Sequence, residues 1–188
     1  MIEDEVIAML RSAHRIGIGD SSISGASEDE ITRFEMANNF RLPDELKQWF
    51  GKCNGSPVNP GGLYSLGPVG NPSSVEWFFK EYPDWKTRGW IPLADDGCGD
   101  IYIAVTSYAI GSNGSHPVCF LDQADFDKPA YSVASGIWQF IYFLLENETL
   151  WNQGMCCYWP FDREQVVRRD PELLECGIAP LPWDADVV

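Results

Sequence analysis

The sequence predicts an α+β fold in which helices cover an antiparallel meander of strands. From Asp100 to Ser107, β-branched and aromatic side chains alternate with a period of two, which is typical of a strand with one buried face. Pro117 to Leu121 indicates the next strand, after a polar turn from Gly111 to Ser115. Helical periodicity recurs on both sides of this region, so the rest of the chain is expected to supply helices that cover the sheet.

An apolar segment from Trp90 to Ala94 leads into the turn that organises the meander. That turn contains three aspartates, Asp95, Asp96 and Asp100, and two glycines at positions 97 and 99. Glycine adopts backbone angles that a side chain resists, so the chain is expected to reverse sharply here.

Four helices are expected before this turn. Ile2 to Arg15 has an apolar face, and a Gly/Ser-rich linker from Gly17 to Gly25 follows it. Ser27 and Glu30 form a capping-box pattern that predicts the start of a helix reaching Phe40. The expected remaining elements are a helix opened by Pro43 and ending at Phe50, a short strand within Gly61 to Leu66, and a helix from Val75 to Glu81 capped by Ser73 or Ser74.

After the meander, Ser135 is expected to cap a long apolar helix that runs through Leu145. The apolar stretch Cys156 to Phe161 is expected to dock on the body of the protein. Asp162 to Cys176 is predicted to be helical with a break at Pro171, and Pro180 to Val188 to be irregular.

Charge restricts the class of partner. The 188 residues include 28 acids and 13 bases, which gives a net charge of −15. This balance disfavours nucleic acid, whose binding depends on cations, and is compatible with a basic protein partner. The alternative interpretation is that the acidity only keeps a cytosolic protein soluble. The N-terminus lacks a signal-peptide pattern and no apolar run is long enough to span a bilayer, so a cytoplasmic protein without membrane contact is expected. Six cysteines without regular spacing are expected to be reduced and mostly buried.

The order of these elements resembles the SUKH superfamily, which includes cell-wall-synthesis regulators and many bacterial immunity proteins. The resemblance rests on the helix containing Glu35, the Leu42-Pro43 step, Asn54-Gly55, Trp90 to Ala94 with the turn after it, and the closing apolar helix. It covers residues 27–149, with the helix before residue 16 and the tail 150–188 as additions to a single domain of 1–188. The resemblance implies a curved antiparallel sheet flanked by helices and a binding role, often inhibition of a toxin.

The predicted function is therefore non-catalytic protein binding, with an immunity protein that neutralises a toxin as the first interpretation. The residues expected to contact the partner are acids and exposed aromatics of the kinds that anchor interfaces: Glu35, Tyr64, Trp85, Trp90, Asp95, Asp96, Asp100 and Tyr102. For each of the aromatic residues, a place in the core is the competing interpretation. For Glu35, the structural interpretation, in which its carboxylate accepts hydrogen bonds within the fold, competes with a role in a pocket.

Three alternatives stay open at this point. Asp95, Asp96 and Asp100 offer clustered oxygens to a divalent cation, although turn-forming acids explain them as well, and no cofactor is expected. Cys98 and His116 are the residue types of a nucleophile and its base, which would indicate a small hydrolase. A regulatory scaffold that binds several proteins fits the same resemblance. Neither the oligomeric state nor the identity of the partner follows from the sequence.

Overall fold

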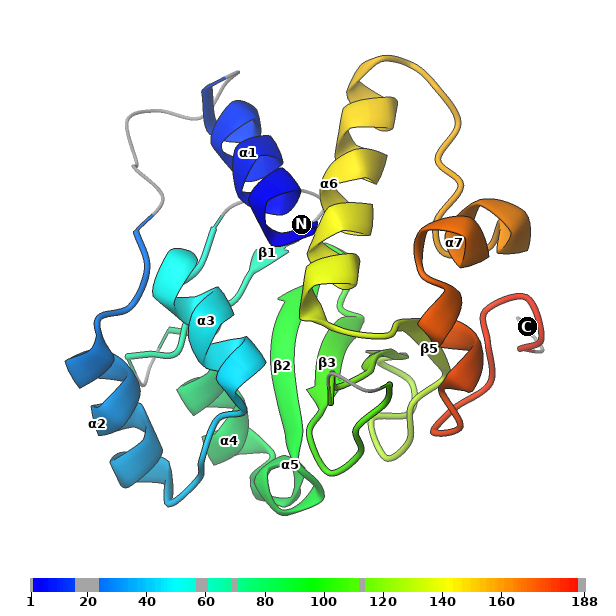
Figure 1. The fold of residues 1–188 in the computed structure, drawn as a ribbon. Helices are drawn as coiled ribbons and strands as arrows, with labels where there is room; N and C mark the ends of the chain where they lie inside the picture. The colour runs from blue at the N-terminus through cyan, green and yellow to red at the C-terminus, as the bar shows by residue number, and fades with distance from the viewer. Residues whose placement is uncertain (1, 16–23, 57–60, 69–70, 112–113, 186–188) are drawn as a thin grey trace.

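The computed structural model describes residues 2–15, 24–56, 61–68, 71–111 and 114–185, and it confirms the α+β prediction (Figure 1). One antiparallel sheet has the order β1-β2-β3-β4-β5, so each strand pairs with the next one along the chain, as expected for a meander. The strands are β1 (Gly62–Leu63), β2 (Trp90–Asp95), β3 (Ile101–Val105), β4 (Val118–Leu121) and β5 (Tyr131–Ala134).

Helices flank this sheet. They are α1 (Ile2–Arg15), α2 (Glu28–Asn38), α3 (Asp44–Lys52), α4 (Val75–Glu81), α5 (Pro83–Arg88), α6 (Ile137–Asn152) and α7 (Arg163–Arg169), followed by a 3₁₀ turn at Pro171–Glu175. The expected linker falls largely outside the described residues. Strand β5 and helix α5 are additions that the sequence patterns did not predict. None of the described helices combines the length and the apolarity needed to cross a bilayer.

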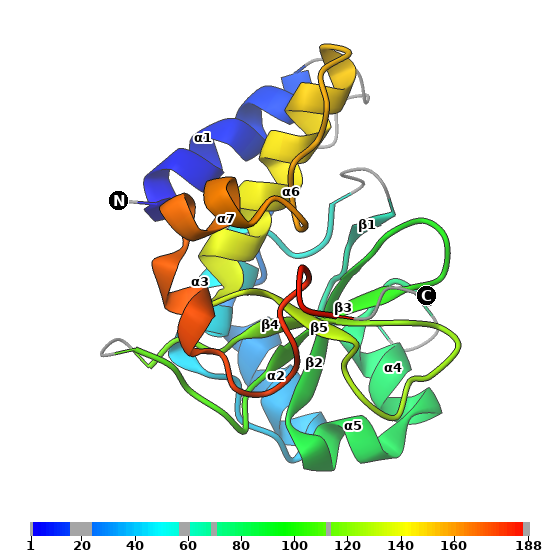
Figure 2. The same ribbon diagram turned by 90° about the vertical axis from the view of Figure 1, so that its right-hand side faces the viewer.

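The main hydrophobic core lies between one face of the sheet and the helices α1, α3 and α6. Val6 and Leu10 of α1 are fully buried against α6, and the buried side chains of α6 contact the sheet on the other side. Figure 2 shows α1, α3, α6 and α7 on one side of the sheet and α4 and α5 on the other. Helix α6 therefore lies between the sheet and α1, which accounts for the apolar side chains on nearly all of its sides.

A second core covers the opposite face of the sheet, where a single buried face had been expected. Ile101, Ile103 and Val105 of β3 pack there, whereas Tyr102 and Ala104 point into the main core. The strand is buried on both faces because aromatic side chains of α4 and α5 cover the face that was expected to be exposed to solvent.

The start of α6 differs from the sequence prediction. Gly136, not Ser135, is the N-cap residue, and it has no side chain to offer. Glu45 of α3 takes that role, since its Oε1 accepts from the backbone N–H of Ile137 at 2.7 Å. A Cβ at position 136 would lie only 2.9 Å from that oxygen, so the absence of a side chain there permits the contact.

Other local signals are confirmed with small shifts. Ser27 and Glu30 form the reciprocal capping box, and Ser74 caps α4. Pro43 is the N-cap of α3 and does not occupy its first helical position, because helical geometry begins at Asp44. Met36 of α2 is exposed although its side chain is apolar.

The tail after residue 150 contributes to the main core. Trp159, Val166 and Leu173 are buried in it, and the docking expected of the Cys156–Phe161 stretch is confirmed at Trp159 and Pro160. The carbonyl of Pro180 accepts from the N–H of Ser132, so the tail also covers the edge of β5.

Candidate functional site

The turn between β2 and β3 uses its three aspartates to order its own backbone. Asp95 Oδ1 accepts from Gly97 N at 2.9 Å, and Asp96 Oδ1 accepts from Cys98 N at 2.7 Å and from Asp100 N at 3.1 Å. Aspartate stabilises turns in this way. The turn is consequently a fixed platform.

Asp96, Asp100 and Asp122 form what we call the acid cluster. Asp100 Oδ1 accepts from the N–H of Gln123 at 2.8 Å, which joins the β2–β3 turn to the end of β4. Desolvation raises the pKa of Asp100, and the charges of Asp96 and Asp122 raise it further, against the lowering effect of the Gln123 hydrogen bond. Asp96 and Asp122 therefore each lie close enough to Asp100 to repel its carboxylate.

A metal site at these acids finds no support in the geometry. Across the described residues, no group of three or more histidine, cysteine or acidic side chains is arranged to hold an ion. The oxygens that a cation would need accept backbone hydrogen bonds instead.

The four aromatic residues that were expected on the surface are buried, so their expected exposure is wrong. Tyr64, Trp85 and Trp90 belong to the second core, where Phe78 stacks on Tyr64 at 5.0 Å and on Trp85 at 5.5 Å between ring centroids. Tyr102 packs in the main core. The physical reason is that a sheet covered on both faces needs apolar bulk on both, and these side chains supply it.

Glu35 has the structural role that was weighed for it. Its Oε1 accepts from the backbone N–H of Leu42 at 2.9 Å and lies 3.0 Å from Lys47 Nζ. The carboxylate thereby joins the loop after α2 to the start of α3. Desolvation acts to raise the pKa of Glu35, but the hydrogen bonds from Lys47 and Leu42 and the charge of Lys47 outweigh it, so the pKa is lowered.

Cys98 and His116 do not form a catalytic pair. In the register of β3 with β4, Ile101 pairs with Leu121 and Ala104 with Val118. Cys98 precedes Ile101 at one end of these strands, and His116 precedes Val118 at the other end. His116 Nδ1 is engaged with the carbonyl of Tyr108 at 2.8 Å, far along the sheet from Cys98. The hydrolase alternative thus loses the convergence of groups that it requires.

The expectation that the cysteines are mostly buried is half correct. Cys53, Cys119 and Cys176 are buried, and their burial raises the pKa of each thiol to about 12. The other three, Cys98, Cys156 and Cys157, are exposed because they lie in turns and in the tail.

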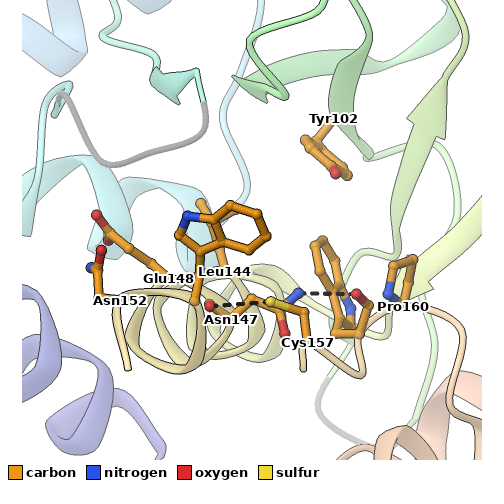
Figure 3. Close-up of a pocket in the computed structure, with 9 residues that line it drawn as sticks. Tyr102, Leu144, Asn147, Glu148, Asn152, Cys157 and Pro160 are labelled. Carbon is orange, nitrogen blue, oxygen red and sulfur yellow. Dashed lines mark hydrogen bonds between the residues drawn. The ribbon is translucent and has the colours of Figure 1, made fainter. Parts of the chain in front are cut away.

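A hollow that sequence reasoning missed lies where the end of α6 meets the tail and the sheet. It has a volume of about 540 Å³ and is lined by Tyr102, Leu144, Asn147, Glu148, Trp151, Asn152, Cys157, Trp159 and Pro160. In Figure 3, Tyr102 faces the α6 residues across the hollow, with Cys157 and Pro160 along one side. The available signal was the uncharged, aromatic stretch from Trp151 to Phe161, of which only Cys156 to Phe161 was interpreted, as a docking segment.

The comparisons with known proteins agree with the fold. No match was found among the curated proteins. A family model, that of the SMI1/KNR4 family (SUKH-1), matches residues 25–142, which is more than half of the chain. The matched range contains the capping box, the strands of the meander, the acid cluster and the first part of α6. The suspected resemblance is therefore confirmed, and the chain belongs to the SMI1/KNR4 family (SUKH-1), a family of immunity and regulatory proteins.

Proposed function

We propose that the protein is a non-catalytic binding module of the immunity type, which neutralises a basic protein partner through an acidic surface. The observation that carries this proposal is the acid cluster, whose carboxylates lie together without an ion-pair partner among the described residues. Residues 89–162 contain no arginine and a single lysine, Lys128, which lies near Asp125. The acids of that range are Asp95, Asp96, Asp100, Asp122, Asp125, Asp127, Glu146, Glu148 and Asp162.

This charge pattern supports fast association with a cationic partner. A surface of one sign raises on-rates by roughly 10- to 1,000-fold at low ionic strength, and the gain falls as salt screens the charges. If the partner is a nuclease toxin, the carboxylates of the acid cluster would occupy the positions where its cationic cleft receives phosphates. Because the turn is ordered by its own hydrogen bonds, little conformational entropy would be lost on binding.

A regulatory scaffold is the second candidate, and the family membership favours it equally. The number of partners separates the two. An immunity protein is expected to hold one basic protein with high affinity, whereas a scaffold is expected to hold several proteins with weaker affinity.

The test is a pull-down of basic proteins with three immobilised versions of the full chain. These are the wild type, the acid-cluster variant D96N/D100N/D122N, and the control D29N/E81Q/E175Q, which removes the same charge at exposed positions elsewhere. Asparagine keeps an acceptor oxygen, so the turn is expected to stay folded, and circular dichroism checks this. Proteins are captured at about 50 mM and about 500 mM NaCl, where the Debye length falls several-fold.

We expect the wild type and the control to retain the same basic protein at low salt, and the acid-cluster variant to lose it. Capture should weaken at high salt. Equal capture by the acid-cluster variant, or turnover of a substrate by purified protein, would count against the proposal.

The exposed thiols agree with a cytoplasmic location, which we include in the proposal. Cys98, Cys156 and Cys157 are free and exposed, and such thiols persist in a reducing compartment.

A further inference from the structure

We propose that an arginine side chain of the basic partner binds where a row of aromatic rings meets the acid cluster. This inference rests on the proposed function and names one contact within it. The rings belong to Tyr102 on β3, Phe120 on β4, Tyr131 on β5 and Phe161 in the tail, and we call them the aromatic row.

The pairing of the strands aligns the aromatic row. Tyr102 is the partner of Phe120 in the register of β3 with β4, and Phe120 is the partner of Tyr131 in the register of β4 with β5. Directly paired residues project from the same face of a sheet. The ring centroids of successive members are 5.3, 4.8 and 6.0 Å apart, so the four rings form one aromatic surface that runs from β3 to the tail.

Exposure increases along the aromatic row. Tyr102 is 7% exposed, Phe120 and Tyr131 are half-buried, and Phe161 is 51% exposed. Tyr102 therefore serves mainly the core, whereas the other three rings keep surface that a partner can cover. Aromatic side chains of this kind commonly anchor protein interfaces.

The same register places two carboxylates next to these rings. The antiparallel pairing of Tyr102 with Phe120 sets Asp100 opposite Asp122 at the end of the two strands. Each aspartate is two residues from its ring, so the acids and the rings lie on one face of the sheet. Like charges opposed across a sheet are unfavourable, and a cation bound between them would relieve the repulsion.

The rings and the acids are also coupled electrostatically. Burial, followed by the charges of all three members of the acid cluster, raises the pKa of Tyr131 to about 12. The hydroxyl of this ring therefore lies within the field of the acid cluster, and the two features form a single surface.

The acids are held in place without being neutralised. The backbone N–H groups of Gln123 and Ala124 donate to Asp100 Oδ1 at 2.8 Å and to Asp122 Oδ1 at 2.7 Å. None of the ion pairs within the described part of the chain involves a member of the acid cluster. Residues 129–162, which carry two of the rings, contain no lysine or arginine. A partner that supplies a cation here therefore has no cation of that stretch to displace.

Arginine matches both parts of this surface. Its guanidinium is planar and weakly hydrated, so it stacks on aromatic rings, and its aliphatic stem packs on apolar surface. Its five N–H donors form a fork that suits carboxylate oxygens.

The protein binds its own arginines in the same manner. The guanidinium of Arg169 lies 5.2 Å from the ring centroid of Tyr142 and 3.8 Å from a carboxylate oxygen of Glu146. Arg88 likewise lies 4.8 Å from the ring centroid of Trp90. The aromatic row and the acid cluster offer the same combination of ring and carboxylate to an arginine from outside.

Other occupants fit less well. A purely apolar side chain would cover the rings but leave the opposed carboxylates of Asp100 and Asp122 unrelieved. Lysine carries its charge on a compact ammonium that cannot stack as a plane. A second copy of the chain would bring another net charge of −15 to the same surface.

The experiment is a titration of the ¹⁵N-labelled full chain with capped tripeptides at constant ionic strength, followed by two-dimensional ¹H–¹⁵N spectra. The probes are acetyl-Gly-Arg-Gly-amide, its lysine version of equal charge, and the version in which neutral citrulline replaces arginine. The amide signals of Gln123 and Ala124 report on the carboxylates to which they donate, and the ring-proton signals of Tyr131 and Phe161 report on stacking.

We expect saturable shifts of both sets of signals with the arginine probe. The lysine probe should bind more weakly by about threefold because it cannot stack as a plane, and the citrulline probe by about tenfold because it has no charge. Equal affinity for the lysine or the citrulline probe would overturn the proposal, as would the absence of shifts at these four residues.

Variants locate the site. F161A should weaken binding of the arginine probe by about threefold and D122N by about fivefold. Both side chains are exposed, so both variants should stay folded, and their urea unfolding midpoints check this. The matched controls on α2 are M36A for the ring and D29N for the acid, and neither should change the affinity. Wild-type affinity in F161A and D122N would place the arginine elsewhere and refute the proposal.

Failure of this inference can be told apart from failure of the proposed function. If the arginine probe causes no shift and F161A retains the basic partner in the pull-down as well as the wild type does, the aromatic row is not used and the proposed function stands. If the probe binds at the aromatic row but no basic protein is retained at low salt, the proposed function fails.

Discussion

Replacing Glu45 by alanine tests whether a side chain of α3 secures the start of α6. In the structure Glu45 Oε1 accepts from Ile137 N at 2.7 Å, and Oε2 accepts from His116 N at 3.3 Å. Ile137 is 1% exposed, so water has little access to replace the lost acceptor in E45A. The second bond is long and its loss should cost less.

The magnitude follows from these two bonds. Leaving a buried donor unsatisfied costs about 1–3 kcal/mol, and removing a carboxylate from a helix N-terminus costs about 0.3–1 kcal/mol. Relief of the desolvation that raises the pKa of Glu45 offsets part of this loss. We expect E45A to lower the free energy of unfolding by about 2 kcal/mol, which corresponds to a fall of roughly 4–8 °C in Tm for a chain of this size.

E45Q separates the hydrogen bond from the charge. Glutamine keeps one acceptor oxygen for Ile137 N, so we expect about half of the E45A loss at pH 7. Burial raises the pKa of Glu45, so the folded state binds a proton more readily than the unfolded state. The wild type should therefore lose stability as the pH rises through that pKa, and E45Q should not show this loss.

The assay is urea unfolding followed by tryptophan fluorescence, with Q48A on the exposed side of α3 as a control expected within about 0.5 kcal/mol of the wild type. An E45A stability within about 0.5 kcal/mol of the wild type would refute the cap. Equal loss in E45Q and E45A would show that charge, rather than the acceptor, is what matters.

Three further predictions follow from contacts elsewhere. G25A should lower the free energy of unfolding by about 1–3 kcal/mol, because its Cβ would lie 1.9 Å from the backbone carbonyl oxygen of Gly51. G51A is the control in the same urea assay and should be neutral or stabilising, because a Cβ at Gly51 meets nothing within 4 Å. D170A should cost about 1–3 kcal/mol, since Asp170 Oδ2 accepts from the buried Ser135 N at 2.7 Å. Burial raises the pKa of Asp170, so the wild type should lose stability relative to D170N as the pH rises through that pKa; a constant difference between pH 4 and 8 would contradict this. Native protein treated with iodoacetamide should gain three labels by intact mass, at the exposed thiols Cys98, Cys156 and Cys157, and six labels would contradict the burial of the others.

Sequence patterns predicted the elements whose signals are local. The capping box at Ser27 and Glu30, the cap at Ser74 and the alternation in β3 each depend on residues that are only a few positions apart in the sequence. These contacts form whenever the local chain takes the conformation that they favour, and they are readable without the rest of the fold.

Contacts between distant segments explain what the patterns missed. The cap on α6 comes from Glu45, 92 residues before Ile137, and no local rule prefers it to Ser135. Strand β5 has only four residues, and its burial comes from the tail and α6 rather than from its own composition.

The residues of the candidate site likewise fall into those that local sequence patterns predicted and those whose placement depends on distant contacts. Asp96 and Asp100 could be selected from the sequence because acids beside glycines mark a turn. The burial of Trp85 and Trp90 could not, because it depends on α4 and α5 folding over the second face of the sheet. The hollow also escaped prediction, since it exists only where α6, the tail and Tyr102 meet.

The burial of both sheet faces limits where a partner can bind. Because α1, α3 and α6 cover one face and α4 and α5 the other, the strands themselves present little surface. What remains is the end of the sheet at the β2–β3 turn, where the acid cluster lies, and the rim formed by the end of α6 and the tail. The first offers charge and the second offers apolar area with exposed Trp151. A partner that engages both would associate quickly through charge and dissociate slowly through buried contacts, so substitutions in the acid cluster should change mainly the on-rate and W151A mainly the off-rate.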